Sequence, residues 1–122
     1  MVGQAAKMFA AGAAWKSAGL GVAGRTLVRG LASKDETVRN IAGILMVKAG
    51  RKSGPLLAAA LKKASHEHAP MLLRILGELG DPQWDGMLER YAENNDPEIA
   101  AAARDAMKAS QFARQDRQRA QP

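Results

Sequence analysis

The stretch DETVRNIAGILMVKAG, residues 35–50, shows the pattern that decides the fold. Its apolar side chains at positions 38, 41, 42, 45 and 49 recur with the spacing i, i+3, i+4, i+7, which places them on one stripe of an α-helix. Gly50 follows, and glycine can adopt the left-handed backbone conformation that ends many helices. The stretch therefore predicts an amphipathic helix over residues 36–49 that needs a neighbour to cover its apolar stripe.

The same pattern recurs along the chain. Residues 35–38 (DETV) have a counterpart in residues 96–99 (DPEI), 61 positions later, which corresponds to two repeats of about 30 residues. Each repeat holds two apolar stripes of helical spacing, so each predicts a pair of helices. The positions that fall in register are Leu27, Leu57 and Leu88; Leu31, Leu61 and Ala92; Ile41, Met71 and Ala102; Ala42, Leu72 and Ala103; and Leu45, Ile75 and Ala106.

Helix boundaries follow from local chemistry. Asp81 and Asp96 each offer a side-chain acceptor to free helix N–H groups and precede a proline, while Gly50 and Gly80 can end helices. Pro70 indicates that the second helix of the middle repeat starts late, after a loop at 66–68. We predict first helices near 23–32, 54–64 and 82–92, and second helices near 36–49, 69–79 and 97–109.

The two ends differ from the repeats. Residues 1–22 are rich in Ala and Gly, and Met8, Ala11 and Trp15 could form the apolar stripe of an N-terminal capping helix. Residues 111–122 are rich in Gln and Arg, so we predict a frayed polar tail. Between them lie three repeat units, at about 23–52, 53–81 and 82–110.

The motifs resemble the short bacterial type of HEAT repeat, which also occurs in phycobilisome-lyase-like proteins. The resemblance covers residues 23–109 and rests on residues 35–50, on residues 76–82 (LGELGDP) and on residues 96–104 (DPEIAAAAR). It implies an all-α fold, a short α-solenoid of about three HEAT-like helical hairpins, and a role as a protein-binding scaffold. Two departures from the family's pattern occur: residues 65–70 (SHEHAP) replace the Asp-Pro entry in the middle unit, and Ala100 is the counterpart of Arg39 in the last unit.

Composition excludes several classes of function. The chain has no Cys, which excludes disulfides, thiolate zinc sites and a cysteine nucleophile, and the default compartment is the cytoplasm. No unbroken apolar run predicts a signal peptide or a membrane span. The net charge of +6 is unevenly distributed: residues 1–65 carry eleven basic against two acidic residues, whereas residues 66–110 carry four against nine. Such a chain could attract a polyanion or an acidic protein.

Two surfaces are candidates for binding. Outward positions of the second helices line one face of a repeat stack, and several of them are apolar where water is expected. We predict that this face binds a protein partner through Asn40, Ile44, Val47, Leu73, Arg74, Arg104 and Lys108. Covering of the apolar positions by the N-terminal helix or by Phe112 is the alternative. A basic set could instead contact nucleic acid: Lys34, Arg39, Lys48, Arg51, Lys52, Lys62 and Lys63.

Catalytic and metal-binding motifs are lacking. His66 and His68 lie two residues apart in a loop without a third His or Cys, so we predict no metal site and no cofactor. No serine lies in a nucleophile motif, and the acidic residues follow helix ends and exposed faces. The sequence favours a non-catalytic protein-interaction module that is not membrane-bound. The alternatives are a nucleic-acid-associated protein and an accessory or regulatory subunit of an enzyme.

Overall fold

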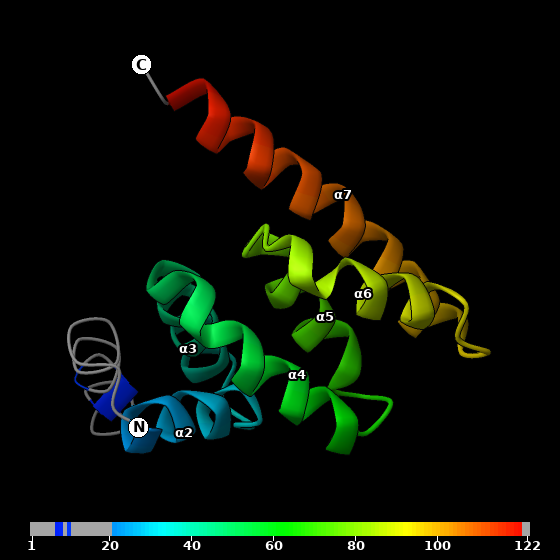
Figure 1. The fold of residues 1–122 in the computed structure, drawn as a ribbon. Helices are drawn as coiled ribbons and strands as arrows, with labels where there is room; N and C mark the ends of the chain where they lie inside the picture. Colours follow the sequence, from blue (N-terminus) through cyan, green and yellow to red (C-terminus); the bar gives the residue numbers. More distant parts are fainter. Residues whose placement is uncertain (1–6, 9, 11–20, 121–122) are drawn as a thin grey trace. The chain divides into compact units, whose positions relative to one another are not determined.

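The computed structural model describes residues 7–8, 10 and 21–120, and over these residues the fold is all-helical with no strand. The chain divides into two compact units, Met1–Leu57 and Ala58–Pro122, and the boundary between them lies within the helix Gly54–Lys63. The helices, labelled in Figure 1, are α2 (Gly21–Leu31), α3 (Glu36–Ala49), the 3₁₀ helix η1 (Gly50–Ser53), α4 (Gly54–Lys63), α5 (Ala69–Glu78), the 3₁₀ helix η2 (Pro82–Trp84), α6 (Asp85–Ala92) and α7 (Pro97–Ala120).

In the first unit, α2 and α3 pack against each other across a short turn. Asp35 caps α3, because its Oδ1 accepts hydrogen bonds from the backbone N–H of Thr37 at 2.9 Å and of Val38 at 3.4 Å. A Cβ added at Gly30 would lie 3.0 Å from the Ala42 Cβ, so the glycine allows the two helices to approach closely. The unit's core is built from Leu27, Leu31, Val38, Ala42 and Met46.

The end of α3 is fixed by two features. Gly50 has a φ of +77°, as predicted for a helix-ending glycine, although its ψ of −144° differs from that of a left-handed helical residue. Ser53 is fully buried, and its hydroxyl donates to the carbonyl oxygen of Met46 at 2.7 Å. This hydroxyl satisfies one of the carbonyls that a helix end leaves without an internal partner.

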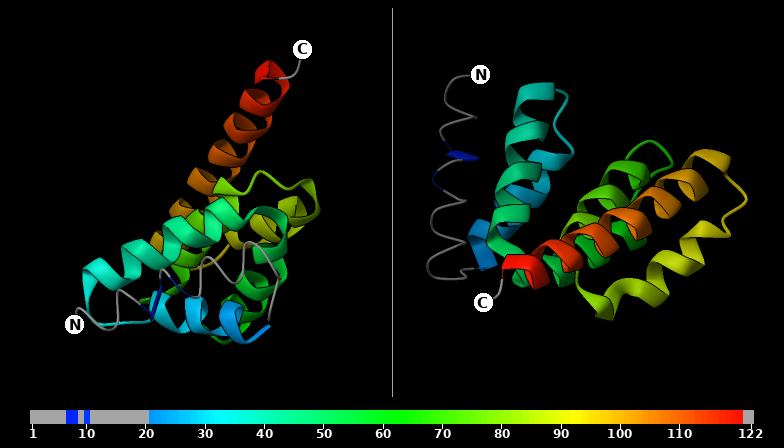
Figure 2. Two further views of the ribbon diagram at one scale, coloured as in Figure 1. Left: turned by 90° about the vertical axis from the view of Figure 1, so that its left-hand side faces the viewer. Right: turned by 90° about the horizontal axis from the view of Figure 1, so that it is seen from above.

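The second unit is built around α5 and α7. Both α5 and α6 pack against α7, and α6 and α7 run side by side in opposite directions (Figures 1 and 2). A Cβ added at Gly77 of α5 would lie 2.6 Å from the Ala106 Cα of α7, which shows how closely these helices approach. Most of α5 is buried in consequence: Ala69, Pro70, Leu72, Leu73, Ile75, Leu76 and Gly77.

The helix boundaries predicted at Pro70, Gly80, Asp81 and Asp96 are confirmed. Asp81 Oδ1 accepts from the backbone N–H of Gln83 at 3.1 Å, and Asp96 Oδ1 accepts from that of Glu98 at 2.9 Å. Gly80 has a φ of +62°. The middle second helix starts late at Ala69, after a turn at 66–68, which places Pro70 in the first helical turn where its missing N–H is tolerated.

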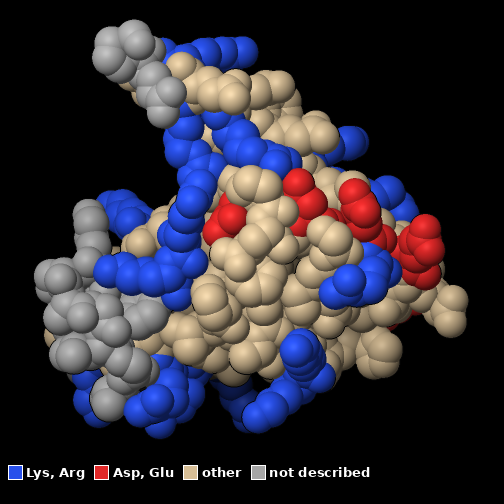
Figure 3. All heavy atoms as spheres, viewed as in Figure 1, with Lys and Arg blue, Asp and Glu red and all other residues tan. Residues whose placement is uncertain are grey.

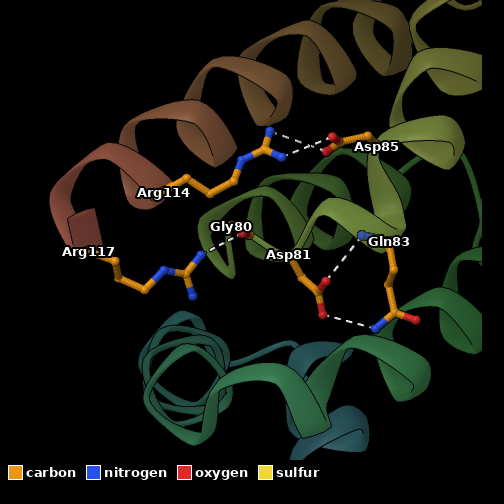
Figure 4. Close-up of polar contacts among 6 residues, drawn as sticks. All are labelled: Gly80, Asp81, Gln83, Asp85, Arg114 and Arg117. Carbon is orange, nitrogen blue, oxygen red and sulfur yellow. Dashed lines mark hydrogen bonds and ion pairs between the residues drawn. The ribbon is translucent and has the colours of Figure 1, made fainter. Parts of the chain in front are cut away.

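The predicted frayed tail is wrong, because α7 continues as one helix to Ala120. The additional turns are held by tertiary contacts, shown in Figure 4. The Arg114 guanidinium binds both carboxylate oxygens of Asp85, at 3.0 and 3.4 Å, and Arg117 donates to the carbonyl oxygen of Gly80. Ser110, one turn before Arg114, is buried. These contacts join the last turns of α7 to the start of α6 and to the residues just after α5.

Little of the predicted capping helix lies within the described residues. Met8 is buried, and its sulfur would lie 2.5 Å from a Cβ added at Gly30, so Met8 packs against α2. Ala11 and Trp15, the other two residues of the predicted stripe, lie outside the described residues.

Candidate interaction surface

Helix α3 presents one face to solvent, opposite the side that packs in the core. Val38, Ala42 and Met46 are buried, and a helix turns by about 100° per residue, so positions 40, 44 and 47 lie on the other side. Asn40 is exposed, Ile44 is 55% exposed and Val47 is half-buried. We call these three residues the α3 face. They are three of the seven residues that the sequence predicted for partner binding.

Leu73 does not belong to an exposed face, and its prediction as a partner-binding residue is wrong. Its exposed fraction is 0%, because α5 is buried on the side that faces α7 as well as on the side predicted to be core. Gly77, one turn further along α5, contacts Ala106 of α7 on this same side. This side of α5 is therefore covered by α7 near Ala106, and not by Phe112, which is itself exposed.

The remaining predicted partner-binding residues lie on the surface of the second unit. Arg74 of α5 and Lys108 of α7 are exposed. Arg104 of α7 is also exposed, and its guanidinium donates to the carbonyl oxygen of Ala92 at 3.4 Å, at the end of α6. Arg104 thus contributes to closing the α6–α7 hairpin.

The seven residues of the predicted basic set lie in several separate parts of the structure. Arg39 is half-buried and donates to the carbonyl oxygen of Ser33 at 2.8 Å, so it stabilises the turn between α2 and α3. Lys34 lies in that turn, while the three other members of the set in this unit lie at the far end of α3 or in η1, about 20 Å away at 1.5 Å per helical residue. Those three are Lys48 and Arg51, both exposed, and Lys52, which is half-buried. Lys62 and Lys63 end α4 in the second unit.

His66 is exposed and forms a hydrogen bond with Asp96. Its Nδ1 lies 3.1 Å from Asp96 Oδ2, while Asp96 Oδ1 caps α7. The His68 ring nitrogen Nδ1 lies 3.0 Å from the Ser65 hydroxyl. Among the described residues, no three His, Cys, Asp or Glu side chains are grouped in a way that could hold a metal ion. The two histidines therefore stabilise the turn before α5 and its contact with the start of α7.

One candidate residue was not included in the predicted binding face. Within the described part of the chain, the large hydrophobic side chains that are exposed are Ile44 and Phe112, and Phe112 of α7 is 67% exposed. The sequence does distinguish Phe112, because it is the one large apolar residue of the polar segment 111–122. A frayed tail would have made it a mobile side chain, whereas the helix gives it a fixed direction.

Comparison with protein-family models, curated proteins and solved structures found no match. Within the described ranges, no helix combines the length and the apolarity that crossing a membrane requires.

Proposed function

We propose that this chain is a non-catalytic protein-interaction module that binds its partner through the α3 face, Asn40, Ile44 and Val47. The observation that carries the proposal is Ile44, whose side chain is more than half exposed on a helix that is capped at one end and closed by a buried serine at the other. Because the helix that carries Ile44 is already ordered, binding requires little further ordering of its backbone, which favours the use of Ile44 as an anchor.

The surroundings of Ile44 indicate the chemistry of the partner. Lys48 follows one helical turn after Ile44 and is exposed, and Arg51, in η1 just beyond the end of α3, is also exposed. Carboxylates on a partner would find complementary charge at this end of the face. We therefore propose a partner segment with an apolar side chain that covers Ile44 and acidic residues beside Lys48 and Arg51.

The finer architecture is part of this proposal. We propose that α2–α3 and α6–α7 are HEAT-like hairpins and that α4–α5 is the departing middle unit. The packing of α2 on α3 and of α6 on α7 supports the hairpins, and the packing of α5 on α7 is consistent with the contact that second helices of neighbouring repeats would make. In such a stack the second helices carry the binding face, which agrees with the position of Ile44 on α3.

The test is capture of partners from nuclease-treated lysate of the source cells at about 0.1 M and at about 0.5 M salt. We expect the wild-type chain to retain a protein at both concentrations, since apolar contacts resist salt whereas binding to nucleic acid falls steeply with it. Ile44→Asp should lose this protein. Ala32→Asp is the matched control, because Ala32 is exposed in the turn after α2 and receives the same charge.

Two outcomes would reject the α3 face. Retention of the same protein by Ile44→Asp, with unchanged helicity by circular dichroism, would show that Ile44 is not the anchor. Binding that appears only at low salt in untreated lysate, and is absent from nuclease-treated lysate, would favour the nucleic-acid alternative, with Lys48 and Arg51 as the first residues to change. An enzyme retained at high salt would identify the chain as an accessory subunit, which uses the same face.

A further inference from the structure

The outer face of α7 is a second, independent surface in the other unit of the chain. Its direction is fixed, because Arg114 pairs with Asp85, Arg117 bonds to the Gly80 carbonyl and Ser110 is buried, all on the inner side of the helix. Phe112 therefore lies on the outer side, where it is 67% exposed. In Figure 2 the C-terminal turns of α7 extend beyond the start of α6.

Charged residues flank Phe112 in a regular order. At 100° per residue, the four nearest outer positions lie within about 40° of Phe112 around the helix. They are exposed and alternate in sign on each side of it: Asp105 and Lys108 before Phe112, and Asp116 and Arg119 after it. Figure 3 shows that Lys and Arg side chains gather around the C-terminal turns of α7. We call these five residues the α7 stripe.

The α7 stripe is complementary to itself when two copies run in opposite directions. Lys108 lies four residues before Phe112 and Asp116 four residues after it; Asp105 lies seven before and Arg119 seven after. A two-fold axis at Phe112 therefore brings each Lys108 to the Asp116 of the second copy. The same axis brings each Asp105 to its Arg119. A parallel pair would place like charges together, which is unfavourable.

We propose that the partner of the α7 stripe is a second copy of this chain, bound antiparallel about a two-fold axis at Phe112. Self-complementary contacts of this kind are the common basis of homodimers. In this dimer Asp116 and Arg119 would each face an oppositely charged residue of the second copy, in place of the weak pair that they form with each other in one copy. The Asp116–Arg119 pair within α7 spans 3.9 Å with both side chains more than 70% exposed, and such surface pairs contribute little.

The association is expected to be weak and reversible. One helix pair buries less than the roughly 1,200–2,000 Å² of a stable interface, and the net charge of +6 on each copy opposes association. A dissociation constant on the order of 0.1–1 mM is therefore expected. Sedimentation equilibrium over a range of about 0.05–2 mM would detect the dimer directly.

The first comparison tests the aromatic anchor. Phe112→Ala removes an exposed side chain and should leave helicity unchanged while weakening dimerisation about tenfold or more. Gln111→Ala is the matched control, because Gln111 is exposed and directly precedes Phe112 but lies about 100° away from it around the helix. A wild-type chain that remains monomeric over the whole range, or a Phe112→Ala chain that dimerises equally well, would overturn the proposal.

The second comparison tests the register. Lys108→Glu and Asp116→Lys each place like charges together in a homodimer, so each variant alone should dimerise less than wild type. An equimolar mixture of the two should dimerise again, since the mixed pair has opposite charges at both contacts. Lower net charge alone would strengthen dimerisation of Lys108→Glu, so the direction of its change is decisive. If the mixture is no more dimeric than either variant alone, the antiparallel pairing is wrong.

Discussion

Gly77 of α5 packs directly against Ala106 of α7. A Cβ added at Gly77 would lie 2.6 Å from the Ala106 Cα and 2.7 Å from its Cβ, whereas carbon atoms in favourable contact are about 3.5–4.0 Å apart. Gly77→Ala should therefore lower the free energy of unfolding of the second unit by about 1–3 kcal/mol. This loss exceeds the gain of up to about 1 kcal/mol that alanine brings to a helix. Urea denaturation followed by circular dichroism would measure it.

Gly86 of α6 provides the matched control for this substitution. It is exposed, and the nearest atom to an added Cβ is Arg90 Nη1 at 4.0 Å, so alanine meets no obstacle there. Gly86→Ala should raise stability by up to about 1 kcal/mol through helix propensity alone. Equal effects of the two substitutions would show that α5 and α7 do not approach each other as described.

Truncation of Leu73 should destabilise the protein far more than truncation of Ile44, although the sequence predicted both for the same binding face. Leu73→Ala removes a side chain that is 0% exposed and should cost about 2–5 kcal/mol of stability. Ile44→Ala removes one that is 55% exposed and should change stability by less than about 0.5 kcal/mol. The ratio of the two losses, measured by the same denaturation assay, distinguishes core from surface. A loss below 1 kcal/mol for Leu73→Ala would contradict its burial.

The different fates of Leu73 and Ile44 show where prediction of the site from sequence stops. Periodicity placed Asn40 and Ile44 on the exposed side of α3, although Val47 is half-buried and Met46, which was not in the predicted stripe, is fully buried. The same periodicity failed for α5, which is covered on the side facing α7 as well. Coverage by a helix distant in sequence leaves no local signal, apart from the near absence of polar residues between Ala69 and Leu79.

The fold itself was more predictable, because its boundaries depend on local chemistry. Asp35, Asp81 and Asp96 cap helices as short-range acceptors, and Gly50 and Gly80 adopt positive φ where helices end. The end of α7 was missed for the opposite reason. Its Gln and Arg composition predicts fraying, and only contacts with Asp85 and Gly80, about 30 residues or more away in sequence, stabilise the helix.

The Arg114–Asp85 ion pair should contribute measurably to the stability of the second unit. It has bidentate geometry, but the side chains are 32% and 40% exposed, so solvent screens the attraction. A double-mutant cycle with Arg114→Ala and Asp85→Ala should give a coupling energy of about 0.3–1 kcal/mol, reduced at high salt. The cycle is needed because Asp85 also lies in the first turn of α6, where a negative charge is favourable in itself. Additive losses would show that the pair contributes nothing.

Replacement of Gly50 by L-alanine should destabilise the first unit, even though there is room for a side chain. No atom lies within 4 Å of a Cβ added there, but the backbone has φ +77° and ψ −144°, a conformation that L-residues with a Cβ rarely adopt. Gly50→Ala should therefore cost about 1–3 kcal/mol through backbone strain alone.

D-alanine at this position, introduced by chemical synthesis of the chain, is the control for this strain. A D-residue prefers the mirror image of the angles that an L-residue prefers, so the angles of Gly50 correspond to an extended conformation that D-alanine adopts readily. The D-alanine protein should be at least as stable as wild type, because the unfolded chain loses conformational freedom when glycine is replaced. If both enantiomers destabilise the first unit equally in thermal denaturation, the cause is crowding, and the open space around Gly50 is wrong.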